Sequence, residues 1–233
     1  MLSFTFDGKD SYKDYGIIIS KRPSIPSPKR KITYVNIPSR NSNLRFDENT
    51  FEDVTIAIEC SVKSKLVPDK IDEIKSWLIG SGESDLIFSF QKEKRYIAQV
   101  INTIDFSQVL KSFSRFIVVF NCRPFKYEVN PETIELSESC KIINIGSYYS
   151  EPLIKIYGIG DIILKVNDVE LNIKSLLENI ILDSKLQNAY NDKSENLNCK
   201  VVGEIPIFKV GENYLSLVGN VSKVEITPNW RWI

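Results

Sequence analysis

The stretch Val54-Thr-Ile-Ala-Ile-Glu-Cys-Ser-Val62 alternates apolar and polar residues over its whole length. Its apolar members are Val54, Ile56, Ile58, Cys60 and Val62. Because successive side chains of a strand point to opposite faces, all five fall on one face. The stretch therefore predicts a half-buried strand in a sheet with one apolar side.

The same period of two recurs on both sides of this stretch and predicts a chain built mostly of strands. In the first half, strands are expected at 3–6, 16–19, 31–37, 86–90, 96–101 and 114–122, and in the second half at 153–157, 162–166, 169–173, 214–218 and 223–227. The segment Val166-Asn-Asp-Val169 predicts a two-residue hairpin turn, since Asn and Asp tolerate positive φ.

One segment of the first half has helical spacing instead. Ile71, Ile74, Trp77 and Leu78 form one stripe behind Pro68, a residue suited to a first helical turn. Gly80-Ser-Gly82 supplies a stop signal. A helix is therefore predicted near 68–79, lying on a sheet.

Length and a change of composition predict two domains. The chain has 233 residues, of which 42% are hydrophobic and 26% charged, as in ordinary globular proteins. Periodicity stops after Cys122, where two prolines and polar residues follow. We predict a mainly β protein with an N-terminal domain at 1–125 that carries one α-helix, in an α+β or β-sandwich-like arrangement, a linker at 126–143 and a strand-rich C-terminal domain at 144–233.

Charge and hydropathy exclude several classes of partner. Lys plus Arg number 30 and Asp plus Glu number 30, so no net field attracts nucleic acid or an anionic membrane. The start of the chain alternates and carries early acids, unlike a signal peptide, and no apolar run approaches the ~20 residues of a membrane helix. Protein partners are expected, with neither membrane insertion nor sequence-specific nucleic-acid binding.

No residue set predicts catalysis. The chain has no histidine, which removes the usual base of a nucleophilic triad, and it lacks the glycine-rich phosphate-binding motifs. Cys60, Cys122, Cys140 and Cys199 are scattered without paired spacing, which favours reduced thiols over a zinc site. Clustered acids are best explained as solvated charge, although two carboxylates suffice for a glycosidase. We therefore predict no enzyme, no metal and no cofactor.

Two groups of residues are candidates for binding. A basic stretch of Lys21, Arg22, Lys29, Arg30 and Lys31 is interrupted by prolines, which favours a stiff exposed loop over a nucleic-acid arm. Trp230 and Trp232 flank Arg231. The two tryptophans either anchor a terminal strand or stack on sugar rings, in which case Tyr148 and Tyr149, adjacent to each other in the sequence, are further stacking candidates.

The order of short motifs along nearly the whole chain resembles the distal tail proteins of long-tailed bacteriophages. The motifs are Phe4-Thr-Phe-Asp-Gly-Lys-Asp-Ser11, Asp14-Tyr-Gly-Ile17, Val35-Asn-Ile-Pro38, Phe51-Glu-Asp53, Ile74-Lys-Ser-Trp-Leu78, 116–120 with Cys122-Arg-Pro-Phe125, Asn144-Ile-Gly146, Glu151-Pro152, Ile154-Lys-Ile-Tyr-Gly158, Ile181-Leu-Asp-Ser184, Ala189-Tyr190, Gly203-Glu-Ile-Pro206, Gly211-Glu-Asn213 and Ile226-Thr-Pro-Asn-Trp230.

This resemblance implies a structural hub in the virion tail. The N-terminal domain would form a homohexameric ring, single or stacked, and the C-terminal domain would be a sandwich similar to galectins or carbohydrate-binding modules. Partners implied are the tail tube protein, the tail tip or tail-associated protein, the tape measure protein and a receptor-binding protein. Arg123, Pro124 and Phe125 would mark the interdomain junction, and Lys29, Arg30 and Lys31 would contact the lumen or tube.

The resemblance also changes two local predictions. Ile173, Leu176, Leu177, Ile180 and Ile181 have helical spacing, but the family implies strand and turn there, and we follow the family. At 38–44 relatives carry glycines in a hairpin turn, for which Asn41 and Asn43 can substitute at positive φ. The alternative function is a module that adheres to host cell-surface glycans.

Overall fold

A computed structural model describes residues 1–63, 67–110 and 113–233 and divides into two compact units. The first comprises Met1–Val129, with the terminal Ile233 grouped in it, and the second comprises Asn130–Trp232. Both are built mainly of antiparallel strands, with one α-helix among the described residues, which confirms the predicted fold class.

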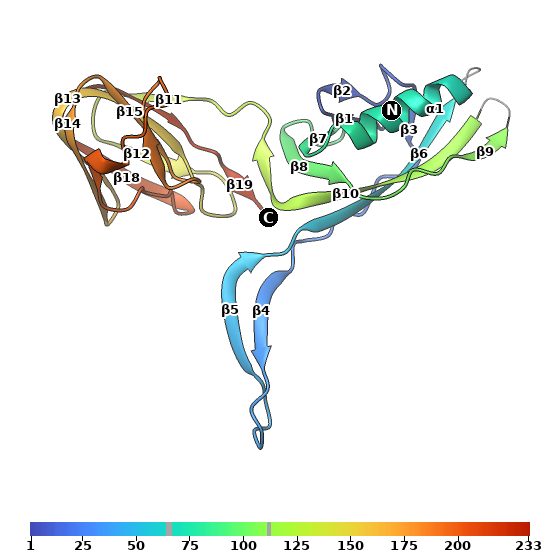
Figure 1. The fold of residues 1–233 in the computed structure, drawn as a ribbon, viewed down its shortest axis with the longest axis horizontal. Coiled ribbons are helices and arrows are strands. Elements are labelled where there is room, and N and C mark those ends of the chain that lie inside the picture. Colours follow the sequence, from blue (N-terminus) through green and yellow to red (C-terminus); the bar gives the residue numbers. More distant parts are fainter. Residues whose placement is uncertain (64–66, 111–112) are drawn as a thin grey trace. The chain divides into compact units, whose positions relative to one another are not determined.

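Unit 1 is a curled antiparallel sheet with the strand order β2-β1-β7-β8-β10-β6-β3, in which β9 also pairs with β10 (Figure 1). Its strands are β1 (Phe4–Phe6), β2 (Lys9–Asp10), β3 (Ile17–Ile19), β6 (Val54–Lys63), β7 (Ser84–Phe88), β8 (Lys94–Val100), β9 (Ser107–Leu110) and β10 (Phe113–Glu128).

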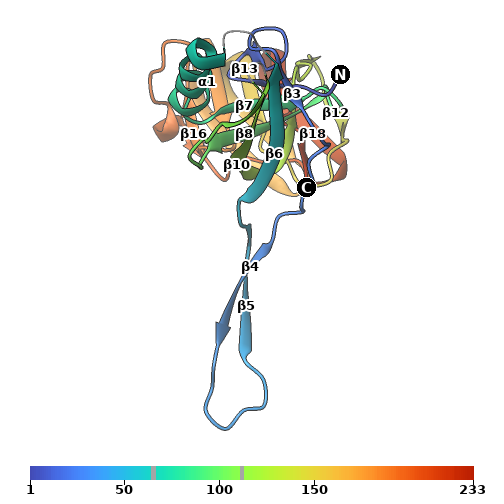
Figure 2. The same cartoon turned by 90° about the vertical axis from the view of Figure 1, so that its right-hand side faces the viewer.

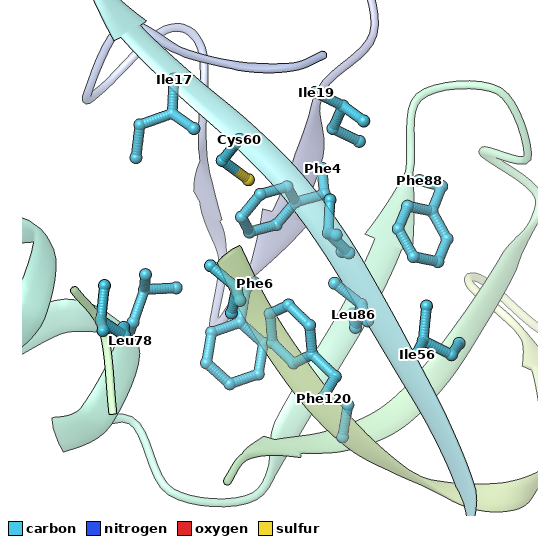
Figure 3. Close-up of a cluster of buried hydrophobic side chains, with 14 of the residues drawn as sticks. Phe4, Phe6, Ile17, Ile19, Ile56, Cys60, Leu78, Leu86, Phe88 and Phe120 are labelled. Carbon is cyan, nitrogen blue, oxygen red and sulfur yellow. The ribbon is translucent and has the colours of Figure 1, made fainter. Parts of the chain in front are cut away.

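The core of unit 1 lies between this sheet and the helix α1 (Val67–Gly80). The alternating residues of β6 point into it as predicted, and Figure 3 shows Ile56 and Cys60 among the surrounding aromatic rings. From the helix, Trp77 stacks on Tyr15, with ring centroids 4.5 Å apart, and its Nε1 donates a 3.0 Å hydrogen bond to the Phe6 carbonyl. The indole donor is thus satisfied within the core.

A hairpin of β4 (Arg30–Val35) and β5 (Leu44–Phe51) forms a separate two-stranded sheet in unit 1. Figures 1 and 2 show the two strands lying side by side as a narrow ribbon. Asn41 and Asn43 do not take the left-handed conformation predicted for the tip. Ser39 does, with φ 67°, as does Asn49 near the base, with φ 55°.

Unit 2 is an eight-stranded antiparallel sheet that folds over on itself. Its main order is β11-β18-β13-β14-β17, with β12 on β18, β15 on β13 and β16 on β15. Its eight strands are β11 (Ile134–Leu136), β12 (Cys140–Asn144), β13 (Leu153–Val166), β14 (Val169–Leu176), β15 (Asn179–Asp183), β16 (Asn188–Tyr190), β17 (Val201–Val202) and β18 (Gly211–Thr227). A 3-10 turn (Asn198–Lys200) precedes β17, and the short strand β19 (Arg231–Trp232) lies outside this sheet.

Two long strands, β13 and β18, pass through both halves of this sheet. Their register shifts where the strands bend, between Tyr157 and Ile163 of β13. Glycines permit the bend: a Cβ on Gly158 would lie 2.5 Å from the Asn220 carbonyl oxygen, and one on Gly219 would lie 2.6 Å from that of Asp161. Each long strand therefore contributes its two ends to different halves of the sheet, whose apolar faces enclose one core.

The helical spacing at 173–181 is misleading, and strand and turn are correct. β14 ends at Leu176 and β15 begins at Asn179, so that Leu177 lies in the turn and is 78% exposed. The spacing of three between Ile173 and Leu176 arises inside β14, where Ser175 has φ 48° and the register with β13 shifts, and a two-residue turn then separates Leu176 from β15. The predicted hairpin at Val166-Asn-Asp-Val169 is confirmed, with Asn167 at φ 55°.

The segment 126–143 contains more regular structure than a linker. β10 continues to Glu128, β11 occupies Ile134–Leu136, and β12 begins at Cys140. Both β11 and β12 pair with β18. Irregular backbone is confined to the short stretches between these strands.

Candidate interaction surfaces

The two faces of the β4–β5 hairpin differ in chemistry. On one face the charges cover the rings: the guanidinium of Arg45 lies 6.0 Å from the centroid of Tyr34, and Arg30 pairs with Asp47 at 3.1 Å. Arg30 also lies over Phe51, 5.8 Å from its centroid. The charged side chains of this face therefore find their partners within the hairpin.

The opposite face is apolar toward the tip, whereas Lys31 and a 2.8 Å hydrogen bond from Thr33 to Glu48 occupy it toward the base. The register pairs Val35 with Leu44 and Thr33 with Phe46, so these side chains share one side of the ribbon. Val35 and Leu44 are each 47% exposed and Phe46 is 64% exposed. A two-stranded hairpin is marginally stable alone in water, and its apolar face gains stability when another surface covers it. This face is the strongest candidate contact surface of unit 1.

The predicted basic stretch lies before and at the base of the hairpin. All five of its cationic side chains are exposed, but several are engaged. Lys29 pairs with Glu52 at 3.2 Å, Arg30 pairs with Asp47, and the Arg22 guanidinium lies 4.3 Å from the centroid of Phe90. Three of the five cations thus contact an acidic or aromatic side chain, so the stretch is not a row of uncompensated charges.

Arg123, Pro124 and Phe125 lie within β10 rather than in a loop. The guanidinium of Arg123 forms two hydrogen bonds with the Glu83 carboxylate, one of them 2.7 Å long, and these raise the pKa of the arginine. The ring of Phe125 meets Phe51 of β5 edge to face, with centroids 5.8 Å apart. Within unit 1, Phe125 thus joins the end of β10 to the base of the hairpin, and Arg123 joins it to the residue before β7.

The predicted aromatic group of unit 2, Trp230, Trp232, Tyr148 and Tyr149, is poorly placed for stacking on a sugar. Trp230 is only 6% exposed and packs on Phe208, with centroids 6.0 Å apart. Tyr148 and Tyr149 contact each other, and the Arg231 guanidinium lies 4.4 Å from the Tyr149 centroid. A ring that binds a sugar needs a free face. Trp230 acts instead as a core anchor, and Trp232 is half-buried beside the core.

Two of the four cysteines, Cys60 and Cys122, have the environment of structural thiols. All four are free, and Cys60 and Cys122 are buried. Burial raises the pKa of the Cys60 thiol to about 12 and, with a smaller contribution from Asp53, that of Cys122 to about 12. Thiolates, which are the reactive form, are thus suppressed in the core. Among the described residues no three Cys, Asp or Glu side chains gather as metal ligands.

A trough of about 680 Å³ lies on unit 1. Its charged lining residues are Glu59, Asp105, Lys21 and Arg115, so its charges balance. Ile117 and Asn102 also line it, and the Asn102 amide bonds the carbonyl of Ile117 and the N–H of Val119 in β10. The asparagine thus continues the hydrogen bonding of β10 where β8 ends.

Sequence reasoning missed the apolar hairpin face. Strand β5 was not predicted, because only Leu44, Phe46 and Phe51 stand among its eight residues as large apolar side chains. The sequence does contain the residues of this face: Thr33 and Val35 alternate along β4, and Leu44 and Phe46 alternate along β5. This alternation becomes informative only when the pairing register is known.

No family model matches the chain, and no curated protein matches its sequence. A solved structure is similar over nearly its whole length: the crystal structure of the SPP1 Dit protein (gp 19.1), described as a paradigm of the hub adsorption apparatus in phages that infect Gram-positive bacteria. The TM-score is 0.79 at 13% identity, covering 97% of this chain and 98% of that one. The fold of both units is therefore shared with the Dit protein of a phage hub adsorption apparatus.

Proposed function

We propose that this chain is a distal tail protein, a structural and non-enzymatic hub of a phage or of a tail-like particle. It would join the tail tube to the tip or baseplate proteins. The observation that supports this most is the similarity to SPP1 Dit, which covers both units in one alignment. The motif order along the sequence points independently to the same family.

Unit 1 would form a homohexameric ring, and unit 2 would be a peripheral galectin-like sandwich. The exposed apolar hairpin face supports self-association, because an arm of that kind gains from a neighbour. Ring closure requires two different surfaces on each copy, repeated by rotation. The formal net charge of zero limits repulsion among six copies around a lumen.

The proposed partners are the tail tube protein, the tape measure protein, a tail tip or tail-associated protein, and a receptor-binding protein. The location would be the virion tail. No helix among the described residues is long and apolar enough to cross a bilayer. Near the proposed lumen, Lys31→Glu should lower the yield of infectious particles if the basic stretch contacts the tube, and an unchanged yield would remove that contact.

Native mass spectrometry tests the ring directly. We expect the chain to form hexamers, alone or with the tail tube protein, and we expect Phe46→Glu to leave it monomeric with unchanged folding. Tyr34→Glu is the matched control, because Tyr34 is similarly exposed, at 56%, on the opposite hairpin face. A chain that stays monomeric with every tail protein, or a stable dimer with affinity for glycans, would contradict the proposal.

The glycan-binding alternative receives less support. The burial of Trp230 and the arginine over Tyr149 leave the predicted aromatic group without an open stacking platform. Binding on an array of bacterial wall polysaccharides that is lost in Trp232→Ala, with folding intact, would restore that alternative.

A further inference from the structure

One edge of β6 has no partner strand along half its length. β10 pairs with β6 from Lys63 to Val54 without a shift in register. On the other side, β3 pairs only with residues 60–62. In the described ranges no strand pairs with 54–58 on that side.

The backbone groups that face this open edge can be identified from the hydrogen bonds. The Ser20 N–H donates to the Glu59 carbonyl at 2.8 Å, so Glu59 points its backbone away from β10. Because N–H and C=O directions alternate along a strand, Thr55 and Ala57 point the same way. Their side chains are exposed, whereas Ile56 and Ile58 are fully buried.

The sequence keeps this edge open. The connection from β3 to β4 carries Pro23, Pro26 and Pro28, which have no N–H to donate. Among the described residues, backbone hydrogen bonds of this connection lie at its two ends: the Ser20 N–H donates to the Glu59 carbonyl, and the Glu52 N–H donates to the Lys29 carbonyl. The connection therefore leaves β6 unpaired where a non-proline segment could have continued β3.

The hairpin is suited to this edge. It is a separate sheet in the structure, and the outer edges of β4 and β5 are both free of partner strands within the described residues. Near its tip it also has an apolar face, as β6 does: Val35, Leu44 and Phe46 gather there, beyond the Thr33–Glu48 hydrogen bond, and Ile56 and Ile58 occupy one face of β6. A strand added to a sheet keeps its faces aligned with those of its neighbour.

We propose that neighbouring copies are joined by strand addition: the open edge at 54–58 of one copy takes an outer strand of the hairpin of a second copy. The apolar hairpin face lies on the same side as Ile56 and Ile58. The inference rests on the proposed ring, because edge and hairpin are different surfaces of one chain and their contact is head-to-tail. Main-chain hydrogen bonds between β6 and the added strand would provide the affinity, and the apolar side chains would fix which residues of the two strands pair.

The test is Ala57→Pro with Ala57→Val as its control. Proline removes the outward N–H but leaves the β10 ladder intact, because the Ala57 backbone faces the open edge. Valine keeps the N–H. We expect Ala57→Pro to weaken self-association by at least about tenfold in native mass titrations, since an added strand loses a hydrogen bond and its fit. Ala57→Val should assemble normally.

Hydrogen exchange provides a second readout that does not depend on the folding of the proline variant. In the ring the amides of Thr55 and Ala57 should exchange at least about tenfold more slowly than in the Phe46→Glu monomer. The Ile56 amide, which faces β10, should change little. The comparison uses the full chain in both states.

Two results would overturn the inference in distinguishable ways. If Ala57→Pro rings persist and the Ala57 amide exchanges equally fast in ring and monomer, strand addition is refuted while the hub function stands. If the wild-type chain never self-associates, even with the tail tube protein, the inference and the proposed ring fall together.

Discussion

The bend of the long strands in unit 2 depends on glycine, and Gly219→Ala tests this. Gly219 has φ +124°, where side chains are strained, and an added Cβ would lie 2.6 Å from the Asp161 carbonyl oxygen and 3.1 Å from the Ile162 Cα. Backbone strain of this kind costs about 1–3 kcal/mol, and forcing an atom into a filled space costs a further ~1–3 kcal/mol. We expect unit 2 to lose about 2–6 kcal/mol of unfolding free energy.

Gly211→Ala is the matched control. Gly211 also has positive φ, +85°, but nothing lies within 4 Å of an added Cβ. It should lose only the strain contribution, about 1–3 kcal/mol. Urea unfolding followed by hydrogen exchange of peptides from β13 and β18 measures both variants on unit 2 itself. Equal losses in the two variants would refute the argument that close approach of the two strands is what excludes a side chain at 219.

Three further predictions concern the core, acid stability and thiol reactivity. Trp77→Ala should destabilise unit 1 by about 3–5 kcal/mol in urea unfolding, because it removes a buried ring and its bond to a carbonyl, whereas Trp77→Phe should cost clearly less. Lys223 hydrogen-bonds Glu225, Lys141 hydrogen-bonds Glu212, and each lysine lowers the pKa of its glutamate below the ordinary 4.5. The two glutamates therefore stabilise the fold above pH 4.5, and this contribution is lost as the pH falls through their lowered pKa values. Glu225→Gln should thus be less stable than wild type at neutral pH but equally stable in strong acid. Exposed Cys199 should react with a thiol reagent at pH 8 in the folded chain while Cys60 does not, and equal rates would contradict the burial of Cys60.

The sequence could predict those elements whose local pattern and tertiary burial agree. Strand β6 and helix α1 each have one apolar side, and each buries that side in unit 1. In both, local periodicity and core formation lead to the same assignment. The predicted turn at Asn167 is correct for a similar reason, since the residues that tolerate positive φ stand where two alternating runs meet.

The failures arise where spacing is set by contacts distant in the sequence. The stripe from Ile173 to Ile181 has helical spacing because a register shift at Ser175 inside β14 and a two-residue turn each change the phase of the alternation. For Trp230 the sequence left two roles open, strand anchor or sugar contact, and the packing on Phe208 that buries its ring joins residues 22 positions apart. This contact has no signature in local periodicity.

The hairpin shows a different limit. Its residues are half-polar and exposed, so one copy of the chain contains neither the core that would mark them as strands nor the surface that would cover Phe46. The apolar face can be interpreted only together with the open edge of β6. There the prolines that follow β3 have no N–H to donate, so the pairing of β3 with β6 does not continue. An exposed apolar ribbon and an unpaired strand edge are each a liability for a monomer. Their presence on one chain is explained if each satisfies the other in a neighbouring copy, which is why interface residues escape prediction from the sequence of a single copy.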